Sequence, residues 1–263
     1  MPYPLPLEPE QLGELTHDAI AGSFRITQRR YGHRYSIDDV LTAHIAASAR
    51  PEAARCLELG SGIGSVLLML AYRLPAAQFV AIEAQRNSFA LLTHNIAQNQ
   101  LETRVRALHG DLRTLVTPAL GSFDLITGTP PYVPPGRATP SSDSQRAYAR
   151  QEFRGGVEDY VAAAARVLSP DGVLVVCADA RAPERVAQAC LQGGLSIRAQ
   201  CDVSPRSGRV PLFSVFTLGG ANAAAPERSL FEARTHDGAR TEQYLALRES
   251  FGMARPCGEP NSP

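Results

Sequence analysis

The segment RCLELGSGIGS, residues 55–65, joins a short apolar run to a turn that holds three glycines. The run is typical of a buried strand, and the apolar segment SVLLMLAYRL (65–74) that follows is typical of a buried helix. A turn without side chains lets a ligand approach the backbone closely. The segment therefore predicts the first strand of an α/β sheet and a ligand-binding turn at its carboxyl end.

Outward from this segment, apolar strand-like runs alternate with helical patterns, which predicts a doubly wound, mostly parallel α/β sheet of the Rossmann-like type. We expect seven strands, at 55–59, 78–83, 104–110, 122–128, 172–178, 196–203 and 212–218. A short N-terminal extension (1–50) precedes the predicted core domain (51–220), and a C-terminal extension and tail (221–263) follow it. Within the N-terminal extension we expect a short helix around Gln11 to Ile20, a strand at 23–28 and a helix that begins after Ser36.

Composition narrows the class of protein. The net charge is zero, which argues against nucleic-acid binding by bulk charge alone but leaves room for a local basic patch. All 26 basic residues are arginine, a bias that suits phosphate recognition but that a GC-rich genome also explains. The five cysteines form no C-x-x-C pair, so we expect no metal site. The chain lacks a long apolar run and an apolar leader, so it is expected to be cytoplasmic and away from membranes. We also expect a monomer.

The glycine turn differs from a dinucleotide fingerprint. That fingerprint, G-x-G-x-x-G, requires its third glycine where Ser65 stands, whereas here the last glycine is Gly64. Two further acids end strands of the predicted sheet. Glu83 ends the second strand, where its carboxylate can bind a ribose diol, and Asp111 follows the third, where it can bind an adenine amino group. A single acid at a strand end is usually a cap, but all of these lie at one edge of the sheet.

The segment ITGTPPYVPPG, residues 126–136, ends the fourth strand with Thr129, Pro130, Pro131 and Tyr132. Elsewhere, such a segment would be a surface turn or a polyproline ligand. At the carboxyl end of a central strand, the two prolines instead make a rigid shelf beside the predicted ligand site.

Together these motifs resemble those of class I S-adenosylmethionine-dependent methyltransferases: E-x-G-x-G-x-G, an acid after strand two, and G-D after strand three. The shelf resembles the [N/D/S]-P-P-[Y/F/W] motif of methyltransferases that act on amino or amide nitrogens. The lead-in ITQRRYGHRYSIDDVLTAHIA and the closing SLFEARTHDGARTEQYLALRESFG are similar to segments of the bacterial valine-tRNA adenine-N6 methyltransferase family. This narrower resemblance covers nearly all of residues 15–252.

The resemblance implies a set of site residues. S-adenosylmethionine would be held by Ser36, Asp38, Glu58, Gly60, Gly62, Glu83 and Asp111. The target would be the exocyclic amine of an adenine in the anticodon loop of a tRNA, turned out of its stack. The amine would donate to the first side chain of the shelf, Thr129, and to the Pro130 carbonyl, while Tyr132 would stack on the base.

The tRNA phosphates would meet arginines of the lead-in and of the stretch after the shelf. We expect Arg30, Arg34, Arg137 and Arg150 to be among them, with Arg25, Arg29, Arg146 and Arg154 as further candidates. Solvated surface charge is the competing interpretation for each of these arginines.

The sequence departs from the family at Thr129, where members normally carry asparagine. A threonine hydroxyl can accept a hydrogen bond, but it is shorter than an amide. Three alternatives follow. The protein could methylate adenine with a changed geometry, methylate another nitrogen such as a glutamine amide or a small molecule, or bind RNA or a partner with little catalysis.

Overall fold

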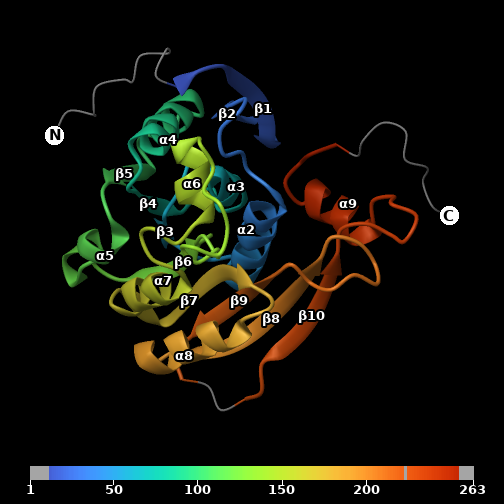
Figure 1. Cartoon of the computed structure of the whole chain (residues 1–263). Coiled ribbons are helices and arrows are strands. Elements are labelled where there is room, and N and C mark those ends of the chain that lie inside the picture. The colour runs from blue at the N-terminus through green and yellow to red at the C-terminus, as the bar shows by residue number, and fades with distance from the viewer. Residues whose placement is uncertain (1–11, 222–223, 255–263) are drawn as a thin grey trace.

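The computed structural model describes residues 12–221 and 224–254, and its centre is an eight-stranded sheet. The strand order is β10-β8-β9-β7-β6-β3-β4-β5, and β9 alone runs antiparallel to its neighbours (Figure 1). The strands are β3 (Arg55–Leu59), β4 (Gln78–Glu83), β5 (Val105–His109), β6 (Phe123–Gly128), β7 (Leu168–Asp179), β8 (Ser196–Ser204), β9 (Phe213–Gly219) and β10 (Glu227–Glu232). The predicted mostly parallel α/β sheet is confirmed.

The expected number of strands is corrected from seven to eight. The extra strand, β10, pairs in parallel with β8 from Glu227↔Ala199 to Glu232↔Ser204 and extends the sheet by one edge. Most of its side chains are exposed, so its sequence carries no buried apolar run that would predict a strand. The limits of the predicted extensions and core domain remain predictions.

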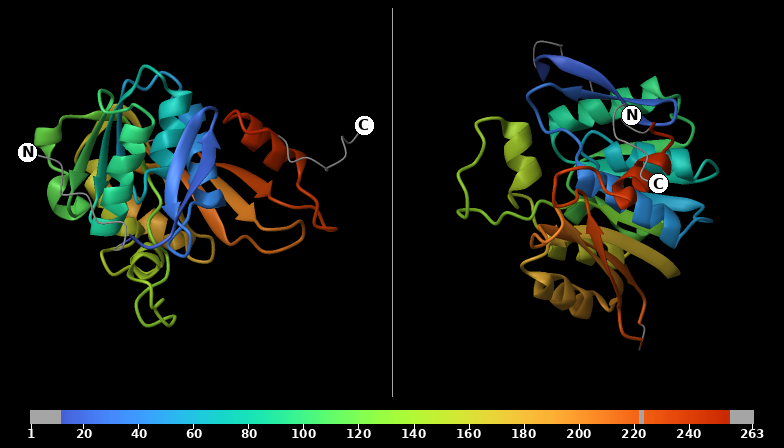
Figure 2. Two further views of the ribbon diagram at one scale, coloured as in Figure 1. Left: turned by 90° about the horizontal axis from the view of Figure 1, so that it is seen from above. Right: turned by 90° about the vertical axis from the view of Figure 1, so that its right-hand side faces the viewer.

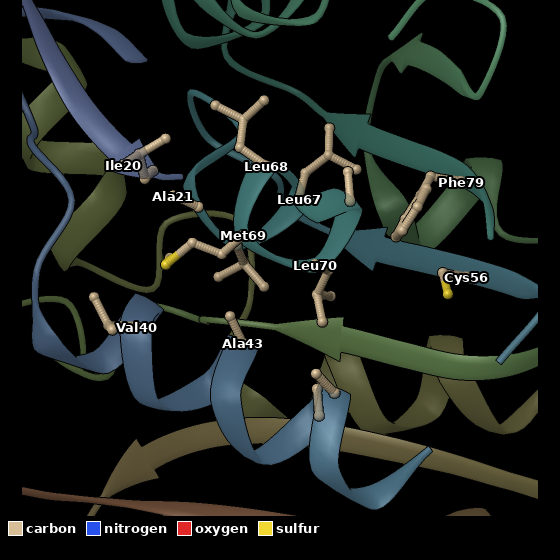
Figure 3. Packing of buried hydrophobic residues seen from close by; sticks show 14 of the residues in the cluster. Ile20, Ala21, Val40, Ala43, Cys56, Leu67, Leu68, Met69, Leu70 and Phe79 are labelled. Carbon is tan, nitrogen blue, oxygen red and sulfur yellow. The ribbon is translucent and has the colours of Figure 1, made fainter. Parts of the chain in front are cut away.

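Helices cover both faces of the sheet, since strands buried on two sides need two apolar layers. One face carries α2 (Ile37–Ala49), α3 (Ser65–Arg73) and α4 (Arg86–Gln98); the other carries α5 (Leu112–Leu115), α7 (Val157–Ala165) and α8 (Pro183–Gly193). Figure 3 shows part of the first layer, where Leu67, Met69 and Leu70 of α3 pack with Val40 and Ala43 of α2. Two separate apolar clusters thus hold the central strands in place.

The N-terminal extension forms a β-hairpin. β1 (Leu15–Ala21) pairs with β2 (Phe24–Arg29) through a turn at Gly22, whose φ is +50°. The expectation of a helix there is wrong for residues 15–20, and Gln11 lies outside the described residues. Pairing with β2, which no local pattern of β1 reveals, overrides the helical pattern.

Asn95 of α4 fastens this hairpin to the core. Its side chain accepts from the Thr27 backbone N–H at 2.7 Å and donates to the Thr27 carbonyl at 3.0 Å and the Ile63 carbonyl at 2.9 Å. These bonds join the hairpin, through Thr27, to the glycine turn that contains Ile63. Asn95 is fully buried, so water does not compete for them.

Two segments flank the carboxyl ends of the central strands. The segment 133–156, which contains α6 (Ser144–Arg150), projects from the domain (Figure 2). The C-terminal helix α9 (Glu242–Glu249) contacts α2, and the buried Phe251 after it accepts from the Gly22 N–H at 2.7 Å. No helix in residues 12–221 or 224–254 is long and apolar enough to cross a membrane.

Candidate active site

A pocket of about 880 Å³, part of it open to solvent, lies at the carboxyl ends of β3, β4, β5 and β6. Ligands of open α/β sheets bind at this edge. Its walls come from the glycine turn after β3, the ends of β4 and β5, the shelf after β6, the lead-in to α2 and the segment 148–160. The sequence signals between Gly60 and Thr129, which lie at the ends of four different strands, therefore meet in one place.

The glycine turn forms the floor of this pocket. Gly60 and Gly62 have φ values of +61° and +56°, a region that residues with a side chain rarely adopt. A Cβ on Gly60 would lie 2.1 Å from the Tyr160 hydroxyl, whereas a Cβ on Gly62 would meet no atom within 4 Å and would enter the pocket. The backbone at Gly62 is thus open to a ligand.

Glu83, at the end of β4, joins two turns. One carboxylate oxygen accepts from the Gly62 N–H at 2.8 Å and the other from the Gln85 N–H at 2.6 Å. Burial raises the pKa of Glu83, and the two backbone N–H groups oppose that rise. Each oxygen keeps a lone pair for a ligand, so the predicted contact with a ribose diol is geometrically open.

Asp111 follows β5 and caps α5. Its carboxylate accepts from the backbone and side chain of Arg113, the shortest bond being 2.6 Å to Nη2. The Arg113 guanidinium lowers the pKa of Asp111 and keeps it ionised. Asp111 lines the pocket at the end of β5, which is the second strand along from β3 in the sheet.

Glu58 is buried behind the glycine turn and does not line the pocket. One of its oxygens, Oε2, has no hydrogen-bond partner within the described structure. Burial raises the pKa of Glu58 well above its ordinary value of 4.5, which favours the neutral form of the side chain. This location indicates support of the turn rather than contact with a ligand.

The first turn of α2 contributes a different residue from those expected. Ser36 is exposed and lines a second pocket beside Tyr244 and Arg248, and Asp38 accepts from the Ser36 hydroxyl. The next residue, Asp39, is buried and lines the main pocket. Its Oδ2 accepts from the Ser36 backbone N–H at 3.0 Å, and its Oδ1 lies 3.5 Å from the Thr129 Oγ1.

The shelf divides between two cavities. Thr129 lines the main pocket, Pro130 and Tyr132 line a second, small cavity that Arg185 also lines, and Pro131 lies between the two and lines both. Tyr132 packs against the apolar cluster of the first layer, and burial raises the pKa of its hydroxyl. The aromatic residue of this region that lines the main pocket is instead Tyr148, which is 40% exposed.

Comparison with known proteins settles the family. Residues 37–193 match the model of the methyltransferase small domain family, a span that contains the whole pocket floor and the shelf.

The chain belongs to this family.

Two curated relatives align with this methyltransferase over almost their whole length. It is 30% identical to a tRNA1(Val) (adenine(37)-N6)-methyltransferase of Aeromonas hydrophila over 236 residues, 87% of this chain and 94% of the relative. A protein of the same name from Tolumonas auensis is 27% identical over 238 residues, 89% of this chain and 96% of the relative.

Solved structures show the same fold at low identity. A predicted O-methyltransferase from Agrobacterium tumefaciens superposes with a TM-score of 0.59 at 18% identity, over 83% of this chain and 98% of that one. A ribosomal protein L11 methylase from Lactobacillus delbrueckii gives 0.52 at 15% identity, over 72% and 81%.

The predicted phosphate-binding arginines of this methyltransferase fall into two groups. Arg30 pairs with Glu14 at 2.6 Å and Arg34 with Asp18 at 3.0 Å, both on the hairpin side. Arg137 and Arg150 are exposed on the projecting segment, and neither makes an ion pair with any residue that the structure describes.

Contacts join the lead-in to the projecting segment. Arg29 pairs with Asp143 at 2.8 Å, the Arg146 Nε donates to the Gly32 carbonyl at 3.1 Å, and the His33 N–H donates to Gln145 at 3.2 Å. The two predicted arginine-bearing stretches are therefore neighbours at the pocket rim.

Sequence reasoning missed Tyr148 and Asp39, which line the pocket, and it offered Arg154 only as a contact for phosphates. Arg154 lies over the Tyr148 ring, with 4.4 Å from its guanidinium carbon to the ring centroid, and Phe153 meets that ring edge-on with 5.4 Å between the two centroids. Only the alternation of arginine and aromatic residues in 146–154 could have indicated this group. For Asp39 the signal was its place three residues after the cap Ser36.

Proposed function

We propose that the protein methylates the exocyclic amino nitrogen of an adenine in tRNA and takes the methyl group from S-adenosylmethionine. The observation that carries the proposal is the meeting of two motifs at one pocket. The glycine turn with Glu83 and Asp111 forms one side, and the T-P-P-Y shelf forms the other. The names of the aligned relatives support adenine in tRNA as the substrate class.

The residues present fit the cofactor. Gly62 leaves space where a side chain would block a ligand, Glu83 has free lone pairs for two hydroxyls, and the pKa of Asp111, the N-cap of α5, is lowered by Arg113. When bound, S-adenosylmethionine supplies a methyl group activated by a positively charged sulfur. The chain's own contribution is to hold the acceptor amine, because the lone pair of such a nitrogen is delocalised into the ring.

The shelf is proposed to hold that amine. The Thr129 hydroxyl and the Pro130 carbonyl each accept one N–H, which leaves the nitrogen lone pair free to face the methyl group. Two consecutive prolines fix these acceptors before the substrate arrives, so little reorganisation is needed. We assign stacking of the base to Tyr148, which faces the pocket, and support of the shelf to Tyr132, which was expected to stack.

The projecting segment is proposed to bind the tRNA backbone. Arg137 and Arg150 are exposed there without carboxylate partners in the described structure, and two exposed aromatic rings lie beside them. Arginine interleaved with aromatic rings suits single-stranded nucleic acid, since the cations meet phosphates and the rings stack on bases. A tRNA substrate also implies that the protein acts in the cytoplasm.

A second candidate is methylation of another nitrogen, such as a glutamine amide or a small-molecule amine. Thr129 favours it, because the reach and hydrogen-bond angle of a threonine hydroxyl differ from those of the asparagine amide that is usual at this position.

The test is transfer of a labelled methyl group from S-adenosylmethionine to total tRNA, to a protein fraction and to a small-molecule extract in parallel. The proposal predicts label in tRNA, loss of most of it in Tyr148→Ala, and near-normal transfer in the matched control Tyr148→Phe, which keeps the ring. Stacking on one base contributes about 1–3 kcal/mol, or roughly 5- to 150-fold in affinity. Label confined to the protein or small-molecule fraction would select the second candidate.

A further inference from the structure

A threonine in place of the usual asparagine raises a problem of direction. An asparagine amide presents a carbonyl oxygen that can only accept, whereas a hydroxyl carries a proton of its own. If the Thr129 O–H points into the pocket, it opposes the N–H of the target amine. Thr129 accepts from the amine only when its own proton points away from it, an orientation that a hydrogen bond to a third group would fix.

Asp39 occupies the place that such a group requires. It extends from the first turn of α2 into the pocket, where 6% of its surface is exposed. Its Oδ2 is held by the Ser36 N–H at 3.0 Å, which fixes the orientation of the carboxyl group. Its Oδ1 faces the Thr129 hydroxyl at 3.5 Å, near the outer limit of a hydrogen bond.

We propose that Asp39 is a positioning residue that accepts the proton of the Thr129 hydroxyl and thereby turns the lone pairs of Thr129 toward the target amine. The pair Asp39–Thr129 then takes the place of a single asparagine. This inference rests on the proposed function, since it assigns a role at the same acceptor site.

The charges around Asp39 decide when it can accept. Burial, followed by the nearby Asp38 carboxylate, raises the pKa of Asp39 from 3.8 to about 8, while hydrogen bonds from Ser36, Ser65 and Thr129 oppose the rise. The other titratable groups facing it are Glu58 of β3, Cys177 of β7 and Tyr132 of the shelf, and burial raises the pKa of each of these three. This set holds no cationic side chain that would lower the pKa of Asp39 again. Asp39 therefore loses its proton, and becomes a carboxylate, as the pH passes through about 8.

A double-mutant cycle tests the pair. Asp39→Asn keeps the size of the side chain and an oxygen for the Ser36 N–H, but its amide can donate to Thr129 instead of accepting. Thr129→Asn provides an acceptor that needs no partner. With wild type, both single variants and the double variant, the single-turnover rate of methyl transfer to tRNA is measured from pH 6 to 9.

The inference predicts that Asp39→Asn slows the wild type by roughly 10- to 100-fold, the scale of one acceptor or donor at a reacting group. In the Thr129→Asn background the same change should alter the rate by less than about threefold, because the coupling between the two residues is gone. The rate of the wild type should rise with pH toward 8, and that of Thr129→Asn should not. Equal losses in both backgrounds would overturn the inference and leave Asp39 a capping residue alone.

A measurement without catalysis separates this inference from the proposed function. Titration of the Asp39 carboxyl by ¹³C NMR, assigned with Asp39→Asn, is compared between wild type and Thr129→Val. Loss of the hydroxyl should raise the titration midpoint, because the Thr129 bond lowers the pKa. An unchanged midpoint would refute the contact. If tRNA receives no methyl group from the wild type, the proposed function fails, and the titration alone still decides whether the pair exists.

Discussion

Replacement of Glu83 by alanine is expected to weaken cofactor binding and to loosen two turns at once. The Glu83 carboxylate accepts backbone N–H groups of Gly62 at 2.8 Å and Gln85 at 2.6 Å, and it is buried. Hydrogen bonds to a charged group contribute about 1.5–3 kcal/mol each. Loss of one such bond to the ribose diol should therefore weaken binding of S-adenosylhomocysteine by roughly 10- to 150-fold, and loss of both should weaken it further.

The same substitution leaves the N–H groups of Gly62 and Gln85 without their acceptor. Each one that water does not reach should lower the free energy of unfolding by about 1–3 kcal/mol. Calorimetric titration with S-adenosylhomocysteine measures the first effect, and urea unfolding measures the second. Glu102→Ala is the matched control, because Glu102 is exposed in the turn between α4 and β5 and should change neither quantity. A folded Glu83→Ala protein that binds with wild-type affinity, or tight binding of NAD by the wild type, would refute the cofactor assignment.

Three further predictions concern the turn, the buried acid and the rim. Gly62→Ala and Gly136→Ala should each lose roughly 1–2 kcal/mol of stability, since both glycines have positive φ with open space around the absent Cβ, but only Gly62→Ala should lose cofactor affinity in calorimetry. The stability of Asp39→Asn relative to the wild type should increase as the pH rises from 4 to 8, by up to about 1.4 kcal/mol per pH unit. The reason is that the unfolded wild type releases the Asp39 proton near pH 3.8 and the folded one near 8. A difference in urea unfolding that does not change with pH would contradict this. Replacing Arg137 and Arg150 together by alanine should reduce the slope of log affinity for tRNA against log salt by about two at most, and an unchanged slope would remove both residues from the interface.

The central fold could be predicted because its signals are local. The glycine turn after β3 and the apolar runs of β4, β6 and β7 each carry their own pattern, and parallel strands must bring their carboxyl ends to one edge. The strand β2 was predicted, but β1 and the hairpin were not, since β1 is a strand through its pairing with β2 and through the anchor that Asn95 provides from another helix. The exposed β10 likewise depends on a partner distant in sequence.

The site was predicted where a motif names the residue and missed where orientation decides. Asp38 and Asp39 are indistinguishable in sequence, but one residue rotates the side chain by about 100° around the helix and moves it from the surface into the pocket. Tyr132 was expected to face the base because it ends the shelf motif. Tyr132 lines the other, small cavity instead, and Tyr148 lines the main pocket.

The central claim, methylation of an adenine amine in tRNA, is tested most directly by mass spectrometry of nucleosides from purified tRNA. Cells that carry the gene are compared with cells from which it is deleted, and with deleted cells that express either the wild type or Glu83→Ala. The account predicts that N6-methyladenosine falls on deletion, returns with the wild type and stays low with Glu83→Ala. An unchanged level of N6-methyladenosine in tRNA after deletion would contradict it.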